Sequence, residues 1–268
     1  FEFHVIAQNI YDPKCVRQFE NLEFKVHLVT HKRTSLVKNC SEIWKILKEE
    51  KFDVAHSHMT LTNFYVLFMA KAARTNIRIS HSHNAFKTEN WKQKVSWPIL
   101  KFLNRKAANI WATCGYDAGA FLFGKKAMQR NQVLVMNNAI DENLFRYNPL
   151  VRKQLREKLG IAEQFVIGHI GRFMEQKNHT FLIDIFYAIQ KEISNSILVL
   201  VGEGDLKPQI EKKVSDLKIE KKVFFLGAMS DVYRFYQVFD AFIFPSLYEG
   251  FGNVLLEAQA CGIQSFTS

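Results

Sequence analysis

The sequence of 268 residues lacks several features that would each indicate a particular class of protein. It has no apolar run of the ~18–20 residues that a membrane-spanning helix needs. It has no low-complexity tract, and its hydrophobic content of 48% is ample for a packed core, which excludes a disordered chain. Its cysteines show no C-x-x-C spacing and no disulfide framework, which suits a reducing cytosol; they are Cys15, Cys40, Cys114 and Cys261. We therefore expect a cytoplasmic protein of one large domain or two of ordinary size.

Acidic residues are scarce between positions 71 and 106, where nine basic residues meet only Glu89. This segment carries +8 of the net charge of +10, because nine positive charges are offset by one negative charge. Tryptophans and aliphatic residues are interleaved with the charges in 91–103. Such a stretch can lie on an anionic membrane surface, bind nucleic acid, or be a helix with a solvated face, and we expect Pro98 to break it. The segment alone leaves these three alternatives open.

Strand and helix patterns alternate along the chain at the spacing of a doubly wound α/β sheet. Short apolar runs predict strands at 1–7, 25–30, 53–58, 77–80, 108–113, 133–136, 165–171, 196–201, 223–226 and 241–244. Amphipathic segments predict helices at 42–51, 63–74, 116–123, 152–159, 180–193, 206–217 and 232–237, and from 253 onward. The pattern loosens after residue 145. We therefore expect one domain in 1–148 and a second in 149–268.

The stretch from Val238 to Gly262 contains the most informative pattern in the chain. Its apolar run at 241–244 suits a strand that is buried on both faces of a parallel sheet. A polar turn with two glycines follows, and a helical pattern begins at Asn253. This order leaves free backbone N–H groups and the positive end of a helix dipole at one place. The stretch therefore predicts a site for an anionic ligand.

Two carboxylates frame this turn, at Glu249 and at Glu257. A phosphate would repel a carboxylate, so both are better placed to accept hydrogen bonds from sugar hydroxyls. By themselves, two glutamates at this spacing are more commonly a helix charge and a solvated side chain. However, the run PSLYEGFGNVLLEAQACG in 245–262 closely resembles the donor-site signature of retaining GT-B glycosyltransferases of family 4. The resemblance implies that Glu249 faces the donor sugar and Glu257 the ribose of the nucleotide.

A second motif, G-H-I-G-R-F followed by Q-K-N, lies at the end of strand 165–171, where ligands of open α/β sheets bind. Arg172 and Lys177 can reach one diphosphate, although two surface cations are the alternative. Family 4 has a similar pair that clamps the nucleotide diphosphate. The G-E-G and G-A-M turns after the next two strands also resemble the family, whereas G-E-G-D-L-K lacks the third glycine of a dinucleotide fingerprint, so NAD is not expected. The implied donor site further includes Gly171, Gly202, Gly227, Gly250, Phe251, Gly252 and Asn253.

Two H-S-H tips end the strands at 53–58 and 77–80. His56-x-His58 and His81-x-His83 could form a metal site, because side chains two apart on a strand share a face, yet no carboxylate or cysteine accompanies them at ligand spacing. The resemblance instead places His83 near the acceptor and the reacting sugar carbon, and His58 on the same side. No D-x-D occurs, which is consistent with a metal-independent donor site in which cations and a helix dipole neutralise the leaving diphosphate. We expect neither a metal nor a cofactor.

The resemblance extends over nearly the whole chain and is greatest to bacterial members that assemble capsular or exopolysaccharide. The family's first strand with its glycine loop, and its closing strand and last helices, have no counterpart, so both domains are expected to be truncated; Gln264 stands where proline is usual. The resemblance implies a retaining hexosyltransferase that moves a sugar from a nucleotide diphosphate, with UDP expected, to a glycan or lipid-linked acceptor. Residues 87–106 would touch the inner membrane surface. A fragment that binds nucleotide without catalysis is the alternative, and a nucleic-acid binder rests on charge alone.

Overall fold

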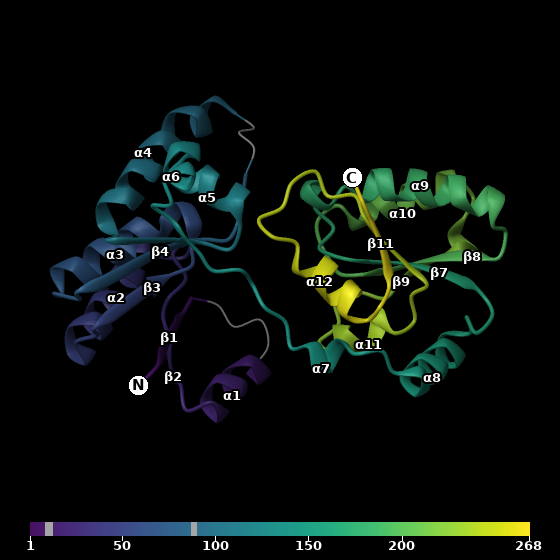
Figure 1. Cartoon of the computed structure of the whole chain (residues 1–268), viewed down its shortest axis with the longest axis horizontal. Helices are drawn as coiled ribbons and strands as arrows, with labels where there is room; N and C mark the ends of the chain where they lie inside the picture. The colour runs from purple at the N-terminus through teal and green to yellow at the C-terminus, as the bar shows by residue number, and fades with distance from the viewer. Residues whose placement is uncertain (9–12, 87–89) are drawn as a thin grey trace. The chain divides into compact units, whose positions relative to one another are not determined.

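The computed structural model describes residues 1–8, 13–86 and 90–268 and divides them into two compact units (Figure 1). Unit 1 comprises residues 1–136 and unit 2 residues 137–268. Lys87 and Glu89, two charges of the basic segment, lie outside the described residues. In each unit the strands pair in parallel and alternate with helices, which confirms the predicted α/β class.

Unit 1 contains a two-stranded and a four-stranded parallel sheet. The smaller pairs β1 (His4–Ala7) with β2 (Lys25–Leu28), which are joined through α1 (Pro13–Asn21). The larger has the order β3-β4-β5-β6, from Val54–Ser57, Ile77–Ser82, Ile110–Thr113 and Leu134–Val135. Its helices are α2 (Leu36–Glu50), η1 (Thr60–Thr62), α3 (Asn63–Ala72), α4 (Trp91–Ala107), α5 (Tyr116–Phe123) and α6 (Lys125–Gln129). Neither α1 nor α6 was predicted from the sequence.

The start of α2 is set by a cap that the sequence analysis overlooked. The helix begins at Leu36 rather than at Glu42, because the Ser35 hydroxyl accepts a hydrogen bond from the Lys38 backbone N–H. Ile43 and Leu47 are buried on its apolar side. The apolar pattern therefore located the later turns of the helix, and the cap adds the turns before them.

The helix α4 continues through Pro98, so the predicted break at this residue is wrong. Proline removes one backbone hydrogen bond from a helix interior, but packing on both sides compensates here. The Trp97 ring lies 5.3 Å from the Phe121 ring, and the buried Asn104 side chain donates to the Leu61 carbonyl at 2.8 Å. With 17 residues α4 is the longest described helix. Neither it nor any other described helix is long and apolar enough to span a bilayer.

Unit 2 is built on one five-stranded parallel sheet of order β11-β10-β7-β8-β9. The strands are β7 (Phe165–Ile170), β8 (Ser196–Val201), β9 (Val223–Phe225), β10 (Ala241–Phe244) and β11 (Gln264–Thr267). The main helices are α7 (Glu142–Phe145), α8 (Pro149–Leu159), α9 (His179–Glu192), α10 (Lys207–Asp216), α11 (Val232–Tyr236) and α12 (Asn253–Ala260). Every residue of β8 and β10 is buried, as the apolar run at 241–244 predicts. The polar run Gln-Ser-Phe-Thr gave no such signal, and β11 was not predicted.

Residues 137–148 belong to unit 2, whereas the boundary expected from the sequence follows residue 148. Phe145 is buried there, with its ring 5.6 Å from that of Tyr236. The Asn148 side chain caps α8 by accepting from the N–H groups of Leu150 and Val151. Packing of one aromatic side chain thus assigns the segment, and the loose sequence pattern before α8 gave no sign of it.

Candidate functional site

The carboxyl ends of β7, β8, β9 and β10 meet at one edge of the unit 2 sheet, because all four strands run parallel. The loops that follow are joined by backbone hydrogen bonds. The Gly171 N–H donates to the Val201 carbonyl at 3.0 Å, and the Gly202 N–H donates to the Gly227 carbonyl at 2.8 Å. Three of the predicted site glycines therefore lie in adjoining loops. Open α/β sheets bind ligands at this edge.

The turn after β8 requires glycine at two positions. Gly202 has φ +144°, and a Cβ added there would lie 2.0 Å from the Gly171 carbonyl oxygen. A Cβ added to Gly204 would lie 2.5 Å from the Phe173 carbonyl oxygen. Real Cβ atoms do not approach backbone so closely, so any side chain would force the loops after β7 and β8 apart. The two glycines of the G-E-G motif therefore allow the loops after β7 and β8 to pack closely against each other.

Lys177 and Glu249 form an ion pair across the edge of the sheet, with Lys177 Nζ 2.7 Å from Glu249 Oε1. Their side chains are only 15% and 23% exposed, so the pair is largely shielded from water. Lys177 Nζ also lies 4.8 Å from the centroid of the Phe244 ring, which adds a cation–π contact. The Gln176 side chain donates to the Tyr248 carbonyl at 2.9 Å and ties the two loops further. Lys177 and Glu249, which were predicted separately, therefore form one ion pair.

Arg172 is exposed at the start of the loop after β7. Within the described part of the chain it makes no ion pair. Lys177 is paired with Glu249, so Arg172 is the cation of this loop that has no ion-pair partner among the described residues, and the exposed Glu175 is the other charge of the loop without one. A guanidinium in this situation can bind a diphosphate as a two-pronged donor.

The predicted ribose residue Glu257 lies on α12 and is held by a tyrosine. The Tyr236 hydroxyl donates to Glu257 Oε2 at 2.6 Å. Burial, the Glu257 charge and this hydrogen bond raise the pKa of Tyr236 far above its ordinary value, so the phenol keeps its proton. Tyr236 was not predicted for the site, because an aromatic residue in a short helix carries no sign of its partner.

The loop that leads into α12 contains the other predicted donor residues. Gly252 takes the left-handed conformation, with φ +79°, and caps the helix. The Asn253 side-chain oxygen accepts from the Asn138 amide at 2.8 Å. Gly250 and Phe251 are half-buried in the same loop. The first turn of α12 is therefore directly connected to the segment that enters unit 2.

Two buried histidines lie behind the Arg172 loop, and the sequence analysis assigned neither to the site. His169 Nδ1 donates to the Ile243 carbonyl at 2.8 Å, while its Nε2 is buried without a partner among the described residues. The His179 ring lies 4.7 Å from the His169 ring and stacks on Phe173 at 4.2 Å. Burial lowers the pKa of His169 to about 4 and that of His179 to about 3. Both rings are neutral at pH 7 and serve as packing for the loop.

In unit 1 the two H-S-H tips come together on adjacent strands. His58 Nδ1 lies 2.7 Å from His83 Nε2, and His56 Nε2 lies 3.0 Å from His81 Nδ1. Burial, with a smaller contribution from neighbouring histidines, lowers the pKa of His58 to about 4 and that of His81 to about 3. The two histidines predicted for the acceptor side, His58 and His83, are thus neighbours.

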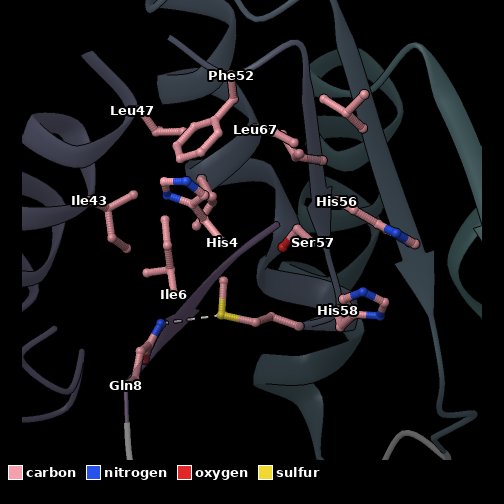
Figure 2. Close-up of a pocket in the computed structure, with 14 residues that line it drawn as sticks. His4, Ile6, Gln8, Ile43, Leu47, Phe52, His56, Ser57, His58 and Leu67 are labelled. Atoms are coloured by element: carbon pink, nitrogen blue, oxygen red, sulfur yellow. Dashed lines mark hydrogen bonds between the residues drawn. The ribbon is translucent and has the colours of Figure 1, made fainter. Parts of the chain in front are cut away.

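A pocket in unit 1 lies beside these histidines (Figure 2). It is lined by residues of β1, α2 and β3, and Figure 2 shows His56 and His58 on one side of it and His4 on another. The labelled apolar lining residues are Ile6, Ile43, Leu47, Phe52 and Leu67. The pocket therefore combines an apolar floor with imidazole groups.

The exposed side of α4 carries an apolar stripe. Trp91, Val95, Ile99 and Phe102 are 70%, 61%, 56% and 51% exposed, at spacings that place them along one face of a helix. Basic residues accompany them on the same helix, namely Lys92, Lys94, Lys101, Arg105 and Lys106. A helix face that contacts only water does not expose apolar side chains on this scale, so this face differs from an ordinary solvated one.

The chain was compared with known protein families. Residues 1–144 match the family described as "Glycosyltransferase Family 4", and residues 151–268 match "Glycosyl transferases group 1". The two matches together cover nearly the whole chain.

Among curated proteins, the chain is 36% identical over 220 residues to "Putative glycosyltransferase EpsF" of Bacillus subtilis (strain 168), covering 81% of this chain and 57% of the relative. It is 28% identical over 241 residues to "UDP-Gal:alpha-D-GlcNAc-diphosphoundecaprenol alpha-1,3-galactosyltransferase" of Escherichia coli, covering 87% of this chain and 62% of that protein. The chain thus spans 57% and 62% of the lengths of these two relatives.

Among solved structures, Anabaena Alr3699/HepE in complex with UDP-glucose aligns with a TM-score of 0.83 at 21% identity, over 98% of this chain and 72% of that chain. The same protein in complex with UDP and glucose aligns with a TM-score of 0.82. At this level of identity the likeness establishes the fold, which is GT-B.

Proposed function

The chain belongs to glycosyltransferase family 4, and from this premise we propose that it carries out the transfer of a sugar from a nucleoside diphosphate to a hydroxyl acceptor. UDP is the expected nucleotide, because the E. coli relative is named for UDP-Gal and the aligned HepE structures contain UDP or UDP-glucose. The acceptor is a glycan or a lipid-linked glycan, since the name of the same relative specifies a diphosphoundecaprenol acceptor. This supports a role in the assembly of a bacterial polysaccharide.

The observation that supports the proposal most directly is the arrangement of charge at the carboxyl edge of the unit 2 sheet. Arg172 offers a guanidinium without an ion-pair partner among the described residues, and Lys177, paired with Glu249, lies in the same loop. The first turn of α12 adds free N–H groups and the positive end of a helix dipole. A diphosphate that departs from a sugar gains negative charge, which these groups would stabilise more in the transition state than in the ground state.

The remaining site residues receive positioning roles under this proposal. Glu249 accepts hydrogen bonds from donor-sugar hydroxyls, and Glu257, held by Tyr236, accepts them from the ribose. His83 and His58 contribute the acceptor side. The bond between the anomeric carbon and the diphosphate breaks with its electron pair on the phosphate oxygen, and the acceptor oxygen bonds to the same carbon. The acceptor oxygen attacks from the face that the diphosphate leaves, and its proton passes to the leaving diphosphate, so configuration is retained without a protein nucleophile.

We also propose that α4 rests on the inner face of the cytoplasmic membrane, where lipid-linked acceptors are located. Its apolar stripe would enter the headgroup region while the flanking lysines and arginines meet anionic lipids. This arrangement favours the membrane interpretation of the basic segment over nucleic-acid binding, because exposed aliphatic side chains gain nothing from phosphate contacts.

A transfer assay tests the proposed activity. The chain is incubated with a radiolabelled UDP-sugar and a membrane extract as acceptor, and release of UDP and label in the lipid fraction are measured together. Arg172→Ala should reduce turnover by about 10²-fold or more, as loss of a transition-state charge contact does. Nucleotide binding without any turnover would instead support the alternative of a nucleotide-binding module. Undiminished turnover by Arg172→Ala would contradict the assignment of the clamp.

A further inference from the structure

Four histidines occupy one face of the unit 1 sheet. β3 and β4 pair in parallel with Ser57 opposite Ser80, so the alternate residues His56 and His58 share a face with His81 and His83. Ring centroids of neighbouring histidines lie 4.0–5.1 Å apart. Imidazoles are therefore concentrated in one place, with no carboxylate among the described residues of the cluster.

The strands that carry these histidines are fixed from the opposite face. The Ser57 hydroxyl donates to Asn63 Oδ1 at 2.8 Å, and Asn63 Nδ2 donates to the Ser80 hydroxyl at 2.9 Å. The same Nδ2 donates to the His81 carbonyl at 3.1 Å, and the Ser82 hydroxyl donates to the Ala118 carbonyl at 2.7 Å. The backbone beneath the cluster is thus locked to α3 and α5, so the strand positions that carry the imidazoles are fixed before any ligand arrives.

Three of the four histidines have the separation of metal ligands. One ring nitrogen each of His56, His58 and His81 lies within 4.8 Å of the other two. Around a tetrahedral zinc ion, nitrogens at about 2.0–2.1 Å from the metal are about 3.4 Å apart. Side-chain rotations that shift a nitrogen by about 1 Å would close that difference.

A second observation also points to a ligand at this cluster. His81 is only 4% exposed, and its Nε2 is buried with no hydrogen-bond partner in the described part of the chain. A neutral imidazole has one N–H and one lone pair, so four crowded rings cannot all be satisfied by one another. Buried polar atoms without partners are uncommon and destabilising. A cation that accepts imidazole lone pairs would satisfy several rings at once.

We propose that His56, His58 and His81 bind one divalent transition-metal ion, with zinc as the representative, and that His83 or water takes the fourth position. Three imidazoles and an open position are a common zinc arrangement, and imidazole also suits copper and nickel. Magnesium, calcium and manganese prefer oxygen ligands, which the cluster does not offer. The site lies in unit 1 and includes His58 and His83, the residues proposed above for the acceptor side, so a bound ion would lie on that side. The proposed donor chemistry in unit 2 invokes no metal. The site departs from the expectation that the histidine tips hold no metal.

A second cluster, of His4, His27 and Glu50, also has ligand atoms within 4.8 Å of one another. It is the weaker candidate, because His4 is already engaged: its Nδ1 lies 2.9 Å from His27 Nε2, and its Nε2 lies 3.2 Å from Glu2 Oε1. It therefore serves as an internal control.

The test is a cobalt titration of the full chain, free of any affinity tag and stripped with a chelator that is then removed. Tetrahedral cobalt absorbs strongly in the visible range, and zinc should displace it whereas magnesium should not. We expect one saturable equivalent whose affinity falls at least about tenfold in His56→Ala, because even second-shell changes cost about 10–100-fold. The matched variant His4→Ala should bind as the wild type does.

Three outcomes would overturn the proposal: no saturable binding, equal affinity in wild type and His56→Ala, or a loss in His4→Ala alone. His58→Ala provides an independent second variant should His56→Ala fail to give folded protein, as judged by circular dichroism. UDP binding measured with and without chelator keeps this test separate from the proposed transfer activity, since we expect the chelator to leave the UDP affinity unchanged.

Discussion

Lys177 Nζ lies 2.7 Å from Glu249 Oε1, so the cation predicted for the diphosphate and the carboxylate predicted for the sugar neutralise each other. The pair is 15% and 23% exposed, a setting in which an ion pair is only weakly screened by solvent. A bound nucleotide-sugar would have to divide this pair, with the diphosphate attracting Lys177 and sugar hydroxyls donating to Glu249. Free UDP offers only the first of these two interactions.

This relationship predicts opposite effects of one variant on two ligands. Glu249→Gln frees Lys177 from its partner, so the affinity for UDP should rise several-fold, on the order of 1 kcal/mol. Transfer from a UDP-sugar should fall, because the carboxylate that orients the sugar is lost. Isothermal titration with UDP and a turnover assay measure the two effects. Parallel losses of UDP affinity and turnover would contradict the account.

The close contact after β8 predicts a large loss of stability on a small change. Gly202→Ala places a Cβ 2.0 Å from the Gly171 carbonyl oxygen at φ +144°, so unfolding should become easier by about 3 kcal/mol or more. Gly160→Ala is the matched control, because φ there is +68° but nothing lies within 4 Å of the added Cβ. It should cost only about 1 kcal/mol. All four tryptophans lie in unit 1, so amide hydrogen exchange in β8 is the appropriate measurement. Equal costs would show that the loops can separate freely.

The buried histidines predict that unit 2 loses stability in acid. The pKa of His169 is lowered to about 4 and that of His179 to about 3, whereas an unfolded histidine titrates near 6.5. The unfolded chain therefore binds more protons below pH 6.5, and stability present above that pH is lost as pH falls toward 4. Between pH 7 and pH 5 each histidine should cost about 2 kcal/mol.

His179→Phe isolates one of these two contributions. Phenylalanine can keep the stack on Phe173 and has no titrating group, so the loss between pH 7 and pH 5 should be roughly halved. Hydrogen exchange in β8 at the two pH values measures the difference. An unchanged pH dependence in His179→Phe would refute the assignment of this effect to the buried ring.

The stripe on α4 predicts binding to anionic vesicles. Ile99→Asp introduces a charge on the apolar face and should weaken binding to phosphatidylglycerol-containing vesicles by about tenfold or more. Leu150→Asp is the control, an exposed apolar residue on α8 of unit 2, and should have little effect. Added salt should weaken the binding of the wild type. If both variants bind equally in a flotation assay, α4 is not the membrane-binding element.

The parts of the molecule that the sequence predicted are those set by short-range patterns. The run at 241–244 is apolar because both faces of β10 are buried. Gly202 is a glycine because its backbone takes a conformation that other residues avoid. Partners distant in the sequence were not predictable in this way. The Lys177–Glu249 pair spans 72 residues, and nothing local links Tyr236 to Glu257. Pro98 shows the same limit, because tertiary packing around Trp97 outweighs a local rule.

The central claim is that the carboxyl edge of the unit 2 sheet binds a nucleoside diphosphate through Arg172. Calorimetric titration of the chain with UDP, alongside ADP and GDP, tests it most directly. We predict saturable UDP binding that weakens by about 10–100-fold in Arg172→Ala, the value of a charge-assisted hydrogen bond, and not in the exposed control Arg130→Ala. A folded, monodisperse chain that binds none of the three nucleotides, or an Arg172→Ala variant that binds UDP as the wild type does, would contradict the account.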